Sequence, residues 1–67
     1  MKIILNDGQE EFPGDSVTVR QILDRKNWSF PLIIARVNGR PVDRKAWDSE
    51  PIRDGAEVEL HHLLSGG

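Results

Sequence analysis

The segment TVRQILDRK, residues 18–26, carries the main helix signal of this sequence. Thr18 and Gln21 have the spacing of a capping box, in which the Thr18 hydroxyl accepts a hydrogen bond from the Gln21 N–H and the Gln21 side chain reaches back. Apolar residues recur on one side of the segment, and polar residues occupy the other. The sequence therefore predicts a helix over about residues 19–26, which buries one face formed by Val19, Ile22 and Leu23.

Strand-like segments, bounded by turn signals, lie on both sides of this helix. Alternating apolar residues predict strands at residues 1–6, 9–12, 33–38, around Val42, and 56–64. Asp7-Gly8, Asn38-Gly39 and Asp54-Gly55 are the turn signals between them. Arg44 to Trp47 has room for one short helical turn. The order of elements is thus strand, strand, helix, strand, short strand, strand.

This order predicts a single α+β domain, in which one helix covers a mixed sheet of four to five strands. If the first and last strands pair in parallel at the centre of the sheet, the fold is a β-grasp, as in ubiquitin. The expected core consists of Ile3, Leu5, Val19, Ile22, Leu23, Val37, Val58 and Leu60. We interpret Trp28 and Trp47 as core or covering residues rather than as ligand platforms.

Composition excludes several classes of function. The 67 residues contain no Cys, which removes disulfides and thiolate metal ligands. The net charge is −2, and the basic residues are scattered, so no stripe for nucleic acid is present. No apolar run approaches the roughly 20 residues that span a bilayer, and no export signal is visible. We therefore expect a cytoplasmic protein that binds neither nucleic acid nor membrane.

The sequence ends in Gly66-Gly67, directly after the last predicted strand. We expect residues 1–64 to form the domain and residues 65–67 to form a flexible C-terminal tail. Glycine suits the last two positions, because a residue without Cβ lets the backbone approach another protein closely. The tail is therefore the first candidate for a functional site.

The whole pattern resembles the ThiS family, the sulfur carriers of thiamine thiazole synthesis. The resemblance begins with the opening MKIILN, continues through Thr18-Val19, Ile22-Leu23, Val37-Asn38-Gly39 and Val42, and ends with Arg44, Trp47, Asp54-Gly55 and Gly66-Gly67. Two features depart from it. Asp43 stands where the family commonly has Pro, and Glu59 and His61 occupy outward positions where relatives often carry apolar residues.

The resemblance implies a protein co-substrate rather than an enzyme. A ThiF-like adenylating enzyme would use ATP and Mg²⁺ to activate the Gly67 carboxylate, and sulfur would replace the adenylate. The resulting thiocarboxylate would donate sulfur to a ThiG-like thiazole synthase. The chain itself would bind no cofactor. Gly66 and Gly67 are then the reacting positions, and the expected partner-contacting residues are Glu59, His61, Leu63, Leu64 and Ser65.

Other functions remain open at this point. A molybdopterin-type carrier, a carrier for another pathway, a ubiquitin-like modifier of lysines and a plain β-grasp interaction domain are compatible with the same pattern. His61-His62 is a poor metal site, because adjacent strand residues point to opposite faces and no third ligand is evident. We therefore assign no metal ligands.

Overall fold

A computed structural model describes residues 1–29 and 32–62 of the chain. The elements are, in chain order, β1 (Lys2–Leu5), β2 (Gly8–Glu11), β3 (Ser16–Val17), α1 (Val19–Lys26), β4 (Ile33–Val37), β5 (Arg40–Pro41), the 3₁₀ helix η1 (Arg44–Ala46), β6 (Ile52–Arg53) and β7 (Glu57–His62). The predicted boundary between domain and tail, at residues 64 and 65, lies outside the described residues.

Helix α1 begins and ends with local signals in the sequence. The Gln21 N–H donates to Thr18 Oγ1 at 3.2 Å, and the Thr18 N–H donates to Gln21 Oε1 at 2.9 Å, so the predicted capping box is present. The helix ends at Asn27, whose left-handed backbone (φ 60°) caps it. The predicted helix over residues 19–26 is therefore confirmed.

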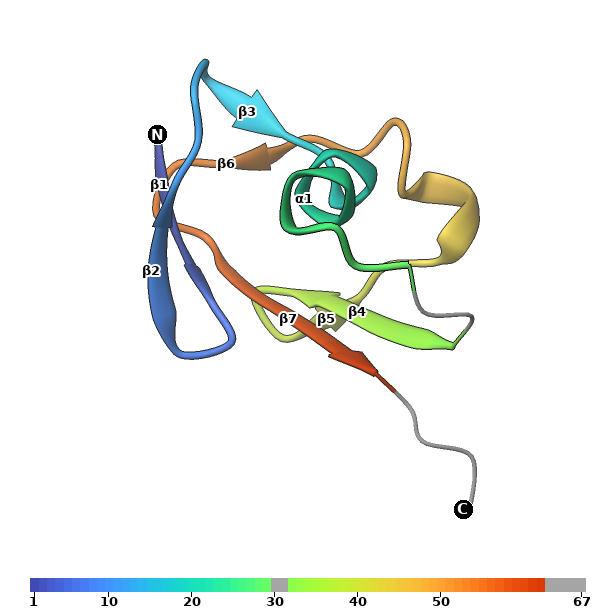
Figure 1. The fold of residues 1–67 in the computed structure, drawn as a ribbon. Coiled ribbons are helices and arrows are strands. Elements are labelled where there is room, and N and C mark those ends of the chain that lie inside the picture. Colours follow the sequence, from blue (N-terminus) through green and yellow to red (C-terminus); the bar gives the residue numbers. More distant parts are fainter. Residues whose placement is uncertain (30–31, 63–67) are drawn as a thin grey trace.

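The main sheet has five strands in the order β2-β1-β7-β4-β5. The first and last of the longer strands, β1 and β7, pair in parallel, and the other neighbours pair antiparallel. Figure 1 shows α1 on one face of this sheet, and no helix of residues 1–29 and 32–62 covers the opposite face. The predicted β-grasp fold, with one helix over a mixed sheet, is confirmed.

Two hairpin turns contain residues with positive φ angles. Asn38 (φ 53°) and Gly39 (φ 81°) connect β4 to β5, as the Asn-Gly signal predicts. The β1–β2 turn lies one residue earlier than predicted, at Asn6 (φ 50°) and Asp7 (φ 70°), because Gly8 already pairs with Leu5. Asparagine and aspartate tolerate the left-handed region, so Gly8 is not needed within the turn.

A second sheet of two strands was not predicted. Ser16 and Val17 in β3 pair antiparallel with Arg53 and Ile52 in β6. Each strand is only two residues long, too short to show an alternating pattern. The small sheet lies beside α1 in Figure 1, and it brings Val17 and Ile52 into the core.

The core lies between α1 and the inner face of the main sheet. Seven of the eight predicted core residues are buried, and the exception is Val37, which is half-buried and packs against the cluster. Val37 is exposed in part because it is the last residue of β4, next to the turn. Buried residues that were missing from the predicted core list are Phe12, Val17, Ala35, Trp47, Ile52 and Ala56.

Trp47 connects the segment around η1 to α1 through hydrogen bonds and packing. Its side chain is 2% exposed, and its indole N–H donates to the Val42 carbonyl at 3.2 Å. The backbone N–H of Arg20, in α1, donates to the Trp47 carbonyl at 3.0 Å. The guanidinium carbons of Arg20 and Arg44 lie 5.5 and 4.6 Å from the ring centroid. Trp47 is therefore a core residue, which is one of the two roles predicted for it outside the core list, and Arg44 packs against it.

Candidate functional site

Strand β7, at the centre of the sheet, precedes the C-terminal residues for which the sequence analysis predicts reactivity. β7 ends at His62, at the lower end of the sheet in Figure 1. The predicted site residues Leu63, Leu64, Ser65, Gly66 and Gly67 lie outside the described residues. The candidate site is therefore built from β7 and the residues that surround it.

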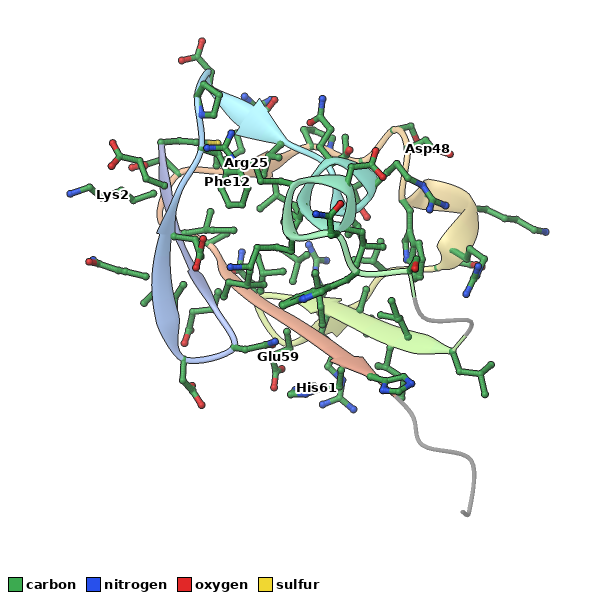
Figure 2. All side chains as sticks on the ribbon, viewed as in Figure 1. Lys2, Phe12, Arg25, Asp48, Glu59 and His61 are labelled. Atoms are coloured by element: carbon green, nitrogen blue, oxygen red, sulfur yellow. The ribbon has the colours of Figure 1, made fainter. Side chains whose placement is uncertain are left out.

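Glu59 and His61 are the two predicted partner-contacting residues that the structure describes. Both lie on the side of β7 away from α1, as Figure 2 shows, because alternate residues of a strand share one face. Their side chains are 45% and 57% exposed, and His61 Nε2 lies 3.5 Å from Glu59 Oε2. The outward placement that the sequence predicted for them is confirmed.

Strand pairing adds residues from β1 and β4 to the same surface. Glu59 lies directly opposite Arg36, His61 lies opposite Ile34, and Glu57 lies beside Ile4 of β1. Ile4 and Ile34 are each 39% exposed. We call this surface the outer face, and it consists of Ile4, Ile34, Arg36, Glu57, Glu59 and His61.

The outer face combines two exposed isoleucines with charges of both signs. Exposed apolar side chains next to charged ones are a usual composition for a protein-binding surface. Arg36 faces Glu59 across the strands, which favours the pairing of β4 with β7. The arrangement is suited to binding another protein rather than to enclosing a small substrate.

Two asparagine side chains bind the backbone of β7, and sequence analysis predicted none of these hydrogen bonds. Leu60 is held on both of its backbone groups by the Asn6 side chain: the Leu60 N–H donates to Oδ1 at 2.9 Å, and Nδ2 donates to the Leu60 carbonyl at 3.0 Å. The Glu57 N–H donates to Asn38 Oδ1 at 3.0 Å. Their positions in hairpin turns next to strands are the signal that could have indicated such bonds.

The described residues give no sign of a metal site or of a membrane segment. They contain no group of three or more His, Asp or Glu side chains that could hold an ion. His61 and His62 point to opposite faces of β7, and both are exposed. No helix within residues 1–29 and 32–62 is long and apolar enough to cross a membrane.

An open groove of about 270 Å³ lies on the other side of β7. It is lined by Asn6, Trp28, Ile33, Leu60 and His62. Trp28 is half-buried and packs against the core, as predicted for a covering residue. The groove is mostly apolar, and both polar groups of the Asn6 amide are already used by Leu60. It therefore offers little for catalysis.

Comparison with known proteins agrees with this architecture. The model of the ThiS family matches residues 3–67. A crystal structure of a thiamine biosynthesis protein, ThiS, from Geobacter metallireducens is similar over 100% of both chains, with a TM-score of 0.84 and 25% sequence identity. A solution NMR structure of a thiamine biosynthesis protein from the same organism gives a TM-score of 0.77 at 25% identity, over 100% of this chain and 88% of that one.

A comparison with curated protein sequences gives no match. The family match nevertheless covers nearly the whole chain, from the first strand to Gly67, and the solved ThiS structure is similar in fold. This chain therefore belongs to the ThiS family.

Proposed function

We propose that this chain is a sulfur carrier of thiamine biosynthesis, and that its Gly67 carboxylate is converted to a thiocarboxylate. The observation that carries the proposal is the family match over residues 3–67, which includes the terminal Gly66-Gly67. The similarity to a thiamine biosynthesis protein of the same length supports the choice of pathway. The absence of Cys supports the choice of chemistry, because no thiol of this chain is available to form a persulfide.

The proposed reaction proceeds in three steps on the terminal carboxylate. One carboxylate oxygen attacks the α-phosphorus of ATP, which forms an acyl adenylate and releases pyrophosphate. A sulfur nucleophile, such as a protein persulfide, then attacks the acyl carbon, and AMP leaves. Reductive cleavage of the resulting acyl disulfide by a thiol gives the thiocarboxylate. A ThiF-like enzyme would supply ATP, Mg²⁺ and stabilisation of the developing charge. The requirement for ATP fits a cytoplasmic carrier.

Within this proposal the chain acts as a co-substrate, and its folded domain provides the binding energy. We propose that the outer face contacts the adenylating enzyme and then a ThiG-like thiazole synthase. Five residues follow His62, and five extended residues reach at most about 18 Å. Docking on the outer face would thus leave the carboxylate able to enter an active site at that distance from the end of β7.

Intact-mass measurement tests the proposal. The parent protein is incubated with the adenylating enzyme, ATP, Mg²⁺, a sulfur source and a reductant, and we expect a mass increase equal to the exchange of one oxygen for one sulfur. A variant that lacks Gly67 serves as the control. It should bind the enzyme with nearly the parent's affinity and gain no sulfur.

Three results would contradict the proposal. They are an unchanged mass of the parent, uptake of sulfur by the variant without Gly67, and formation of isopeptide adducts on lysines in place of the thiocarboxylate. The last of these results would favour a ubiquitin-like modifier.

A further inference from the structure

Strand β7 pairs with its two neighbouring strands over different lengths. On one side, β4 pairs with β7 from Val58 to His62. On the other side, β1 pairs with β7 only over residues 4–5 and 57–58. Beyond Val58, the described residues provide no further strand on the β1 side. The Leu60 N–H and carbonyl, which face this edge, therefore need partners other than a neighbouring strand.

The Asn6 side chain makes the hydrogen bonds that a neighbouring strand would make with Leu60. The Asn6 backbone N–H donates to the Val58 carbonyl at 2.9 Å, at the end of the β1–β7 pairing. The side-chain amide then accepts from the Leu60 N–H and donates to the Leu60 carbonyl. A carboxamide offers one acceptor and a donor side by side, as a peptide group does. Asn6 thus extends the pairing of β7 by two residues toward the tail.

Asn38 makes comparable bonds at the opposite end of β7. Its backbone N–H donates to the Glu57 carbonyl at 2.7 Å, and its Oδ1 accepts from the Glu57 N–H at 3.0 Å. It also lies in a hairpin turn, with nearly the same backbone angle as Asn6 (φ 53° and 50°). Asn38 therefore holds the start of the strand, and Asn6 holds the part next to the tail.

We propose that Asn6 is a positioning residue for the C-terminal reaction, because it fixes the point from which the tail leaves the domain. This inference rests on the proposed function. Without the Asn6 amide, Leu60 loses both of its hydrogen bonds on the β1 side, and the end of β7 moves more relative to the docked domain. The carboxylate is then presented over a larger volume, so fewer encounters reach the reactive geometry. Docking itself remains, because Glu59 and His61 keep their β4 partners.

The test compares Asn6→Gly with Asn38→Gly. Glycine tolerates a positive φ, so each variant removes the amide without straining the turn. Hydrogen exchange of the Leu60 and Glu57 amides reports directly on the hydrogen bonds that they donate to the two asparagine side chains. We expect the Leu60 amide to exchange about tenfold faster in Asn6→Gly and the Glu57 amide to keep its parent rate. Asn38→Gly should show the reverse pattern.

Steady-state activation by the adenylating enzyme tests the positioning role. Asn6→Gly should lower kcat by about tenfold, with KM within about twofold of the parent, because docking is retained and alignment is lost. Asn38→Gly should leave both constants near the parent values. Asn6→Asp keeps an acceptor for the Leu60 N–H but loses the donor, and it should lie between the parent and Asn6→Gly.

Each other outcome overturns the proposal in a recognisable way. Equal kcat values for Asn6→Gly and Asn38→Gly would refute the positioning role and leave the carrier function intact. A parent protein that is not activated at all would refute both proposals, whatever the exchange rates. If Asn6→Gly does not fold, Asn6→Asp must still show a lower kcat at unchanged KM, and a parent-like kcat in that variant would refute the positioning role.

Discussion

The two faces of β7 differ sharply, although their residues alternate along six consecutive positions. On the inner face, Val58 and Leu60 are 1% and 5% exposed and pack beneath α1. On the outer face, the Glu59 and His61 side chains are 45% and 57% exposed. The same strand therefore contributes both to the core and to the surface on which we expect partners to dock.

Along β7, the residues of the inner face contribute to stability, and we propose that the alternate residues of the outer face contribute to partner binding. A substitution on the inner face removes packing, and its cost includes the cavity left behind. A substitution on the outer face changes charge or apolar area that is already in contact with water. The following predictions test this separation, in order of their expected effect on the free energy of unfolding.

The largest effect is expected for Leu23→Ala, on the surface of α1 that covers the inner face. Leu23 is 2% exposed, so truncation should lower the free energy of unfolding by about 2–5 kcal/mol, enough to unfold much of so small a domain. Ile34→Ala, at an outer-face residue that is 39% exposed, is the matched control and should cost less than about 1 kcal/mol. Urea denaturation measures both.

A Leu23→Ala protein with the same denaturation midpoint as Ile34→Ala would contradict the expected difference in stability between the two variants. It would mean that the helix contributes little to burial of the inner face.

An intermediate effect is expected for Thr18→Ala. This change removes the hydroxyl that accepts from the Gln21 N–H at the start of α1, and loss of such a cap costs about 1 kcal/mol. Thr18→Ser retains a hydroxyl and should remain within about 0.5 kcal/mol of the parent. Thermal unfolding of the two variants checks this. Equal stability of Ala and Ser at this position would show that packing alone holds the helix.

The smallest effect on stability is expected for Glu59→Lys on the outer face. An exposed charge contributes little, so the free energy of unfolding should change by less than about 1 kcal/mol. The association rate with the adenylating enzyme should nevertheless fall by about two- to tenfold at low salt, if a basic surface of the enzyme meets this face. Stopped-flow binding at several salt concentrations measures this rate.

Glu50→Lys is the matched control for charge, since it changes the net charge by the same amount on the segment between η1 and β6. If Glu50→Lys slows association as much as Glu59→Lys does, net charge rather than the outer face directs the encounter.

Much of this fold could be predicted from local sequence patterns. The capping box at Thr18 predicted the helix, and the Asn38-Gly39 signal predicted the β4–β5 hairpin, because each depends on neighbouring residues only. Local sequence patterns did not predict the features that depend on pairing between distant segments. Strands β3 and β6 contain two residues each and exist because they pair with each other. Val37 alternates correctly, but the end of its strand leaves it half-buried.

The site was predicted only along one strand. Alternation within β7 was sufficient to place Glu59 and His61 outward. Arg36, Ile34 and Ile4 join them through cross-strand register, which a local pattern does not contain. Asn6 was missed for a similar reason, since its side chain bonds to a residue 54 positions away. What sequence analysis lacked was therefore the pairing of distant strands.

The central position of β7 also affects how the chain folds during synthesis. The strand nearest the C-terminus lies between β1 and β4, so neither of these strands has its central neighbour until β7 has been made. The ribosome makes the N-terminal elements first, and such long-range pairing slows folding. A nascent chain that stops before Glu57 lacks both the middle of its sheet and its terminal glycines. Completion of the fold thus depends on a strand that lies close in sequence to Gly66-Gly67, where we propose that the reaction takes place.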